Sequence, residues 1–262
     1  VDDPEPFTNL LCQGMVLKDG GKMSKSVGNV VSPEEIVGKY GADTARLFIL
    51  FAAPPEKDLE WSDQGVEGSY RFLKRVWNIV GKYEDIQTEE KGKLSSDEFA
   101  LRRKLHQTIK KVTEDLDGKF AFNTAISAIM ELVNDMYRFI ESRDTIEASL
   151  SGELVRNLLI LLAPFVPHMT EELWQSAGQK EESIHLAAWP ACDESALVVD
   201  EVELAVQVNG KVRATISVPV AMAREEIGEK AQALPEIQKF TEGKTIVKVI
   251  VVPKRIVNIV VK

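Results

Sequence analysis

Residues 20–28 read Gly-Gly-Lys-Met-Ser-Lys-Ser-Val-Gly, and this short stretch is the most informative part of the chain. Lys22 and Lys25 stand three residues apart with the small hydroxyl residue Ser24 between them, and glycines flank the group. Glycine permits a mobile loop, while ammonium and hydroxyl groups bind phosphate oxygens. The pattern predicts a loop that closes positive charge over a polyphosphate.

When ATP is attacked at its α-phosphate, negative charge builds up on the departing pyrophosphate. A lysine that meets this charge mainly in the transition state lowers the barrier. We expect Lys25 to fill this role, with Lys22 beside it. One charge-assisted contact contributes roughly 1.5–3 kcal/mol, or about one to two powers of ten in rate. Taken alone, the pentad is also compatible with a solvated surface loop. The residues expected to contact the nucleotide are Lys22, Met23, Ser24, Lys25 and Ser26.

The surroundings of the loop resemble the class I aminoacyl-tRNA synthetases, whose signature loop has the same Lys-Met-Ser-Lys-Ser sequence. Residues 28–33, Gly-Asn-Val-Val-Ser-Pro, continue the family pattern. Further stretches are similar to the bacterial leucyl branch of the family, namely residues 5–11, 14–17, 40–44, 59–62, 71–77, 122–125, 163–174 and 207–213. No leucine-specific insertion precedes the loop, which implies a compact variant.

The related isoleucyl and valyl enzymes share the loop, so they are the nearest alternatives within the family. The former commonly carry a zinc-binding tail, which the two isolated cysteines Cys12 and Cys192 cannot form, and the latter end in a coiled coil. Neither ending matches this chain, and no zinc is predicted.

The resemblance implies the C-terminal portion of a leucine–tRNA ligase, which joins leucine to its tRNA and uses ATP with Mg²⁺ as the substrate complex. The implied partners are leucine tRNA and the N-terminal catalytic portion, in the same polypeptide or as a separate large subunit. None of His106, His168 and His185 begins the family's His-x-Gly-His motif, and the amino-acid pocket and editing domain are missing. We therefore expect the chain to be inactive alone.

A noncatalytic tRNA-binding module, or the small subunit of a split synthetase, is the alternative function. The intact pentad favours a part in catalysis, whereas Val1 in place of an initiator methionine favours a fragment over a natural subunit.

Composition places the chain among water-soluble globular proteins. It has 262 residues, of which 44% are hydrophobic and 28% charged, and a net charge of −9. This acidity argues against nonspecific binding to nucleic acid, so RNA contacts must be local. The longest apolar stretch, residues 158–166, contains Pro164 and is too short to cross a membrane. With two distant cysteines, these features predict a cytoplasmic protein.

The expected fold class is multidomain α+β. The resemblance implies that residues 1–68 form the end of a class I nucleotide-binding domain with the loop and a stem-contact region. Here Ser32 and Pro33 predict a capped helix start, Gly41 a helix end, and Asp43 the cap of the next helix.

Residues 69–190 predict a helical bundle, because apolar residues recur at three- and four-residue spacing. Ser95 and Glu98 predict a capping box. Trp77 and Trp174 are expected in the core, and His168 is expected to be structural rather than catalytic. The bundle resembles the anticodon-binding domain of the same synthetases.

A basic helical face is predicted within this bundle. Arg71, Lys74 and Arg75 lie opposite an apolar stripe, so they could track a phosphate backbone, with a solvated face as the alternative. The runs Arg102–Lys104 and Lys110–Lys111 are weaker candidates, since exposed charge on helices is ordinary.

Residues 200–262 predict a small β-β-α-α-β-β domain. Asn209-Gly210 is a strong hairpin signal between strands with alternating apolar residues, which in the second strand are Val212, Ala214, Ile216 and Val218. The segment resembles the C-terminal domain of leucyl-tRNA synthetases, which reaches the tRNA elbow. Lys211 and Arg213, opposite Val212, are the predicted tRNA contacts.

Overall fold

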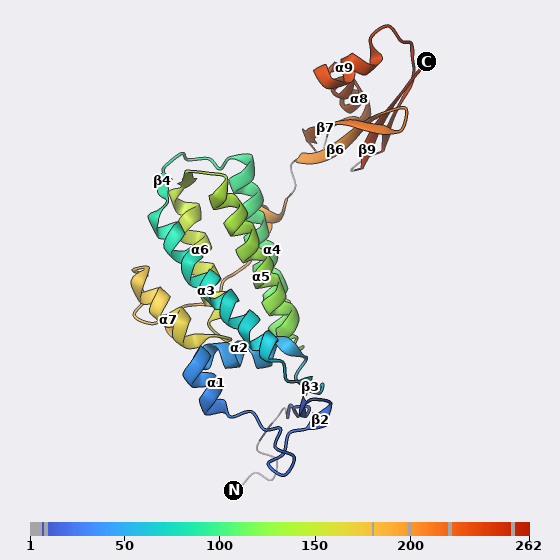
Figure 1. The fold of residues 1–262 in the computed structure, drawn as a ribbon. Helices are drawn as coiled ribbons and strands as arrows, with labels where there is room; N and C mark the ends of the chain where they lie inside the picture. Colours follow the sequence, from blue (N-terminus) through green and yellow to red (C-terminus); the bar gives the residue numbers. More distant parts are fainter. Residues whose placement is uncertain (1–6, 8–9, 180, 199–200, 220–221, 253–254) are drawn as a thin grey trace. The chain divides into compact units, whose positions relative to one another are not determined.

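The computed structural model describes every residue except 1–6, 8–9, 180, 199–200, 220–221 and 253–254. The chain folds into two compact units, Val1–Leu197 and Val198–Lys262, which we describe separately (Figure 1). The expectation about Val1 and part of the 5–11 resemblance fall outside the described residues. Within those residues, no helix has both the length and the apolar character needed to cross a bilayer.

The lysine-rich loop starts from a small three-stranded sheet. β1 (Val16–Lys18) pairs antiparallel with β2 (Gly21–Lys22) and parallel with β3 (Leu59–Glu60), which gives the order β2-β1-β3. Asp19 and Gly20, in the turn between β1 and β2, have φ angles of 56° and 74°. Positive φ at both central residues suits a tight hairpin turn. The loop therefore leaves the sheet directly from the end of β2.

Two helices follow the loop, α1 (Pro33–Tyr40) and α2 (Ala42–Ala52). Gly41 separates them at φ 85°, and its N–H donates to the carbonyl oxygen of Val37 at 2.9 Å, as predicted for a glycine that ends a helix. Ser32 occupies the N-cap position of α1, but its side chain makes no capping hydrogen bond, so that prediction was wrong. The proline after it already removes one of the amide groups that a cap would serve.

Helices α3 to α7 form a bundle that shares one hydrophobic core with α2. They are α3 (Asp63–Asp85), α4 (Ser96–Leu116), α5 (Phe122–Glu141), α6 (Ala148–Leu162) and α7 (Pro167–Ser176). Leu47 of α2 is fully buried in the same core as the bundle residues. β4 (Gln87–Glu89) pairs parallel with β5 (Thr145–Glu147) and so joins the end of α3 to the start of α6. The support of the loop and the bundle are thus packed as one body.

The predicted helix signals in the bundle have mixed outcomes. Ser95 and Glu98 form the predicted capping box at the start of α4, and Trp174 is fully buried as expected. Trp77 is 47% exposed, so its prediction as a core residue was wrong. It follows the buried Val76 on α3 and lies at the edge of the apolar stripe, where helical spacing alone does not distinguish a buried from an exposed position.

The second unit is a four-stranded sheet with two helices on one face (Figure 1). Its elements are β6 (Glu201–Val208), β7 (Lys211–Pro219), α8 (Arg224–Ala233), α9 (Pro235–Thr241), β8 (Ile246–Val252) and β9 (Ile256–Val261). The strand order is β7-β6-β9-β8, with β6 and β9 parallel. The predicted joint at Pro253-Lys254 and the side chain of Val202 are outside the described residues.

A β-bulge changes the predicted orientation of β7. Val206 pairs with Ala214 and Gln207 pairs with Val212, so Arg213 has no cross-strand partner. The extra residue moves Val212 to the face of Gln207, away from the buried Val206. Accordingly Val212 is 58% exposed and does not continue the predicted alternation with Ala214, Ile216 and Val218.

Candidate functional site

Asn29 holds the lysine-rich loop in shape. Its side-chain oxygen accepts the N–H of Ser24 at 2.9 Å, and its Nδ2 donates to the carbonyl oxygens of Lys18 at 3.2 Å and Lys22 at 3.3 Å. The N–H of Gly28 also donates to the carbonyl oxygen of Ser24, at 3.1 Å. One amide side chain therefore joins both ends of the loop. We did not predict this role of Asn29 from the sequence, although an Asn next to a Gly is typical of a tight turn.

The two loop lysines are exposed and uncommitted. Among the described residues, neither Nζ of Lys22 nor Nζ of Lys25 forms an ion pair or hydrogen bond. The hydroxyl groups of Ser24 and Ser26 lie 3.0 Å apart between them. Two free ammonium groups and two hydroxyl groups on a shaped loop are suited to binding an anion with several oxygens.

Helix α2 fixes the loop's support to the bundle through two side chains one turn apart. Asp43 is 8% exposed. It was predicted to cap its own helix α2, but that prediction was wrong, because Gly41 occupies the N-cap position of α2. Oδ2 of Asp43 accepts the N–H of Met169 at 2.7 Å, and its Oδ1 lies 2.8 Å from Nδ1 of His168, both in the first turn of α7. A carboxylate there satisfies an otherwise unpaired amide group of the helix end.

Arg46 completes this clamp from the same helix. Its Nε and Nη2 donate to the carbonyl oxygens of Phe165 and Pro164, at 3.3 and 3.2 Å, in the turn between α6 and α7. We call Asp43 and Arg46, with the backbone groups they bind, the α2 clamp. Because α1 and α2 carry the loop, the clamp limits how the loop can move relative to the bundle.

The basic face predicted on α3 is exposed. Arg71, Lys74 and Arg75 all lie on the solvent side of the helix. Arg75 is partly committed, because its Nη2 donates to Oδ1 of Asn134 at 2.8 Å and its guanidinium lies 4.9 Å from the ring centroid of Tyr137. Arg71 forms no ion pair among the described residues, which leaves its guanidinium available.

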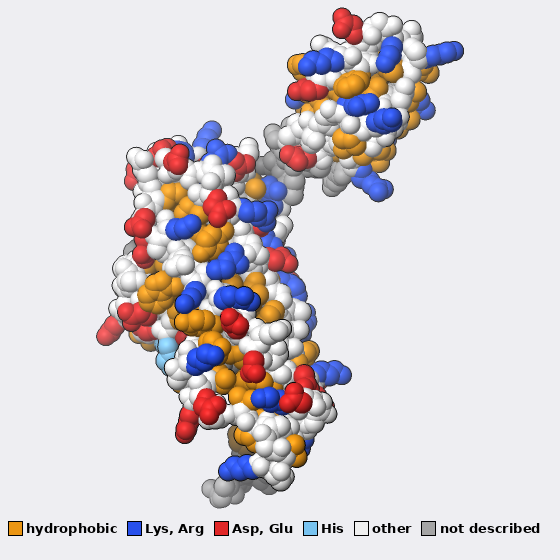
Figure 2. Space-filling model, viewed as in Figure 1, with side chains coloured by type: hydrophobic (Ala, Val, Ile, Leu, Met, Phe, Trp, Pro, Cys, Tyr) orange, Lys and Arg blue, Asp and Glu red, His pale blue; other side chains and the backbone are white. Residues whose placement is uncertain are grey.

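Lys82 extends this face and was missed in the sequence analysis. It lies seven residues after Arg75 on the exposed side of α3, and its Nζ is 5.3 Å from the ring centroid of Tyr137. Seven residues are two helical turns, so the spacing itself could have identified it. Figure 2 shows Lys and Arg side chains interspersed with hydrophobic side chains along this helix.

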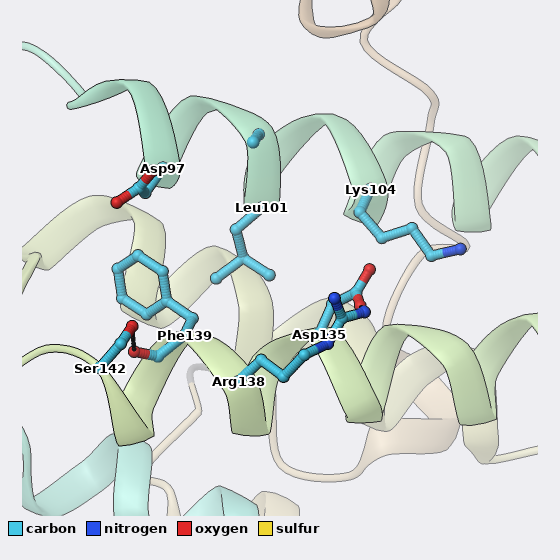
Figure 3. Close-up of a pocket in the computed structure, with 8 residues that line it drawn as sticks. Asp97, Leu101, Lys104, Asp135, Arg138, Phe139 and Ser142 are labelled. Carbon is cyan, nitrogen blue, oxygen red and sulfur yellow. Dashed lines mark hydrogen bonds and ion pairs between the residues drawn. The ribbon is translucent and has the colours of Figure 1, made fainter. Parts of the chain in front are cut away.

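The basic runs of α4 are mostly neutralised by acidic partners. Lys104 pairs with Glu131 of α5 at 2.7 Å, and Lys111 pairs with Asp115 at 2.5 Å. A groove of about 380 Å³ lies between α4 and α5, and its lining mixes both signs of charge (Figure 3). Its lining includes Asp97, Lys104, Asp135 and Arg138, and Arg138 is ion-paired with Asp135. This surface is a weaker candidate for phosphate binding than α3.

A partly buried charge cluster fastens the segment after α7 to the bundle. Arg102 donates to Glu153 at 2.8 Å and to Asp193 at 2.9 Å. Nδ1 of the buried His106 accepts the N–H of Asp193 at 3.1 Å, so its Nε2 donates to Glu153 at 3.0 Å. The short 3₁₀ helix η2 (Glu194–Leu197) follows directly. We call Arg102, His106, Glu153 and Asp193 the α4 latch.

The acids of the α4 latch are held ionised. Burial disfavours the charge of Glu153, but the hydrogen bonds from His106 and Arg102 outweigh it and lower its pKa. Hydrogen bonds from Ser195 and Arg102 lower the pKa of Asp193 to about 2. The latch therefore uses Arg102 for structure rather than for ligand binding.

In the C-terminal unit, Lys211 has a cross-strand partner on β6, whereas Arg213 is the extra residue of the bulge. Lys211 pairs with Val208, on the helix-covered face, and is exposed at the end of β7. The guanidinium of Arg213 lies 4.3 Å from the ring centroid of Phe240 in α9. Both basic groups remain at the surface, with Arg213 oriented by the aromatic ring.

The described residues offer no obvious metal site. No group of three or more His, Cys, Asp and Glu among them is arranged to hold a metal ion. Cys12 is exposed, whereas the thiol of Cys192 donates to the carbonyl oxygen of His106 at 3.4 Å. Both cysteines are free thiols.

The loop and bundle match two families of known proteins. Residues 1–62 match the class I tRNA synthetases for I, L, M and V, and residues 98–227 match the anticodon-binding domain of tRNA ligases. The second match starts in α4 and ends in α8, so it extends into both compact units. The chain belongs to the class I aminoacyl-tRNA synthetases.

Individual relatives specify the branch. The leucine–tRNA ligase of Thioalkalivibrio sulfidiphilus (strain HL-EbGR7) is 52% identical over 267 residues, a match that covers 100% of this chain and 32% of that protein. The LeuRS of Agrobacterium radiobacter K84 (agnB2), solved in a ternary complex with tRNA and LeuAMS, superposes with a TM-score of 0.66 at 34% identity. The superposition covers 95% of this chain and 32% of the LeuRS chain. The chain is a leucyl-tRNA synthetase homologue that corresponds to the C-terminal portion with the anticodon-binding domain.

A more distant neighbour supports the fold alone. The methionyl-tRNA synthetase of Mycobacterium tuberculosis, solved with methionyl-adenylate, is 23% identical with a TM-score of 0.52, covering 64% of this chain and 38% of that one. The chain thus spans about a third of the length of its leucyl relatives.

Proposed function

We propose that this chain supplies the ATP-closing loop and the tRNA-docking surfaces of a leucine–tRNA ligase. In the complete enzyme, leucine and ATP, with Mg²⁺ accompanying the nucleotide, form leucyl-adenylate and pyrophosphate. The leucyl group is then transferred to the end of leucine tRNA. The observation that carries the proposal is the pair of free lysines, Lys22 and Lys25, on a loop stapled by Asn29.

Lys25 meets the charge that develops on pyrophosphate, with Lys22 beside it. Met23, Ser24 and Ser26 complete the contact with the nucleotide. Because both lysines lack a partner among the described residues, their positive charge is not neutralised before ATP arrives. Asn29 reduces the loop's conformational freedom, which lowers the cost of closing it over the phosphates.

Three parts of the chain have separate tasks in this proposal. Residues 1–68 finish the catalytic domain, residues 69–190 form the anticodon-binding-type bundle, and residues 200–262 reach the tRNA elbow. Arg71, Lys74 and Arg75 contact the tRNA backbone from the bundle, and Lys211 and Arg213 contact it from the C-terminal domain. The remaining two-thirds of the enzyme is the chain's catalytic partner, in the same polypeptide or as a large subunit. We place the enzyme in the cytoplasm.

The alternative, a noncatalytic tRNA-binding module, shares the docking surfaces but not the loop chemistry. Leucine-dependent exchange of pyrophosphate into ATP separates the two. A full-length ligase carrying these residues should catalyse the exchange and should lose most of it when Lys25 is replaced. Pyrophosphate exchange that is unchanged when Lys25 is replaced would favour the noncatalytic tRNA-binding module.

A further inference from the structure

A small aromatic slot lies beside the α2 clamp. Tyr40, Tyr70 and Trp77 line a cavity of about 230 Å³ whose walls come from α1, α2, α3 and α7. The rings of Tyr40 and Tyr70 meet edge to face with centroids 5.4 Å apart. Trp77 is 47% exposed and leaves its indole open to solvent. We call these three residues the aromatic slot.

The slot has an apolar floor and a cationic rim. Leu73 and Met169 contribute to the lining, while Nζ of Lys74 is 4.6 Å from the ring centroid of Tyr70. Nζ of Lys39 is 4.8 Å from that of Tyr40. Acidic neighbours of Lys39, Asp63 and Glu67, offset part of its charge, so Lys74 is the principal cation of the rim.

The single carboxylate in the lining is hydrogen-bonded to the protein. Asp43 is 8% exposed, and both its oxygens are engaged by the first turn of α7. The same contacts fix the position of Met169 in the floor. The slot is therefore held rigid from behind and presents aromatic faces and ammonium groups to solvent.

The dimensions suit a single planar ring. Small-molecule sites usually enclose about 300–1,000 Å³, so this cavity is smaller than a site for a whole ligand. Aromatic faces bordered by lysines are the usual platform for a nucleobase and its phosphate. A base inside a duplex has both faces covered by its neighbours, and only an unpaired base can enter such a slot.

We propose that the aromatic slot binds an unpaired nucleobase of the RNA partner, with Lys74 contacting the adjoining phosphate. Tyr70, Lys74 and Trp77 occur at four- and three-residue spacing on α3, on the side of the helix that also carries Arg71. The base would therefore lie alongside the backbone contacts proposed above. This inference rests on the proposed tRNA-docking function and adds a specific nucleotide contact to it.

Replacement of Trp77 in a full-length ligase tests the slot. Trp77→Ala should weaken binding of leucine tRNA about 5- to 150-fold, the loss expected for one base stacked on an aromatic ring. Trp77→Phe, which keeps an aromatic face, should lose less. Trp189→Ala is the matched control, because Trp189 is 39% exposed on the same unit but donates to Thr113, outside the slot.

Tryptophan fluorescence provides a second readout that a loss of folding would not imitate. Adding tRNA should change the emission of the wild type and of Trp189→Phe, and the part of that change due to stacking should disappear in Trp77→Phe. In the free enzyme, acrylamide should quench the emission contributed by Trp77. A Trp77 signal shielded from acrylamide would show that protein covers the slot and would overturn the inference.

The outcomes also separate this inference from the proposed function. Unchanged tRNA affinity and fluorescence in the Trp77 variants, alongside weakened binding when Lys211 and Arg213 are reversed, would overturn the slot and leave tRNA docking in place. A wild-type enzyme that fails to bind leucine tRNA would overturn both.

Discussion

The carboxylate of Asp43 accepts the backbone N–H of Met169, so a side chain of α2 caps the first turn of α7 across 126 positions of sequence. Arg46, one turn further along α2, binds the turn before α7, and together these contacts join α2 to the bundle. Helix α2 and the bundle are therefore joined by hydrogen bonds as well as by a shared core.

The clamp makes a measurable contribution to stability. Asp43→Ala leaves the N–H of Met169 unpaired, and we expect it to lower the free energy of unfolding by about 1–3 kcal/mol. Asp43→Asn keeps an acceptor for that N–H and should lose less. Urea denaturation of the 262-residue chain measures both. Glu84→Ala, an exposed change on α3, serves as the control, and equal effects of Asp43→Ala and Glu84→Ala would refute the capping role.

Lys25→Ala should slow adenylate formation about 10- to 100-fold in a full-length ligase, as expected for the loss of one charge-assisted contact. The affinity for leucine should change less, because the charge acts mainly as pyrophosphate departs. Single-turnover kinetics measure the rate of this step. Lys57→Ala, an exposed lysine in the same segment, is the control and should leave the rate unchanged. An activation rate unaffected by Lys25→Ala would contradict the assignment.

Asn29→Ala should release the loop without unfolding the protein, because it removes three hydrogen bonds confined to residues 18–29. Trypsin cleaves after lysine, so cleavage after Lys22 and Lys25 should become about 5- to 10-fold faster, which corresponds to the roughly 1 kcal/mol of a typical hydrogen bond. The urea midpoint should stay near that of the wild type. A cleavage rate equal to the wild type's would show that Asn29 does not hold the loop.

The two basic surfaces should act in tRNA binding and not in adenylate chemistry. Charge reversal of Arg71 with Lys74, or of Lys211 with Arg213, should weaken tRNA binding and aminoacylation while pyrophosphate exchange stays nearly intact. Each lost phosphate contact should lower the slope of log affinity against log salt by roughly 0.7–0.9. Unchanged tRNA binding by both double variants would mean that these residues are ordinary solvated side chains without a role in tRNA binding.

The contribution of the α4 latch to the free energy of unfolding should decrease as the pH falls. Glu153 and Asp193 have pKa values lowered by folding, from ordinary values near 4.3 and 3.9. Their contribution to stability is therefore complete above about pH 5 and is lost as the pH falls toward 2. Glu153→Gln should destabilise the chain by about 1–3 kcal/mol at pH 7.

The difference in the free energy of unfolding between Glu153→Gln and the wild type should shrink as the pH falls below the ordinary pKa of a glutamate, as urea denaturation at several pH values would reveal. A difference that stays constant over this range would mean that the ionised form of Glu153 contributes nothing to the latch.

Local sequence signals predicted local structure well. The Ser95–Glu98 capping box, the end of α1 at Gly41 and the Asn209-Gly210 hairpin each depend on residues within one turn of each other, and all three are present. The lysine-rich pentad identified the loop for the same reason.

Features that depend on contacts between residues distant in sequence could not be predicted from local sequence signals. Asp43 has the chemistry of a cap, but the helix that it caps is chosen by tertiary packing. Trp77 lies at the margin of a stripe, where neighbouring helices decide burial, and Val212 follows a bulge that alternation cannot reveal. The α4 latch likewise required the fold to bring Glu153 and Asp193 to Arg102.

The assignment to leucine can be tested by aminoacylation of tRNA with a full-length ligase carrying these residues, supplied in turn with leucine, isoleucine, valine and methionine. We expect that leucine alone is attached efficiently and that the 262-residue chain by itself attaches none. Efficient attachment of another of these amino acids, or tRNA binding without any attachment by the full-length protein, would contradict it.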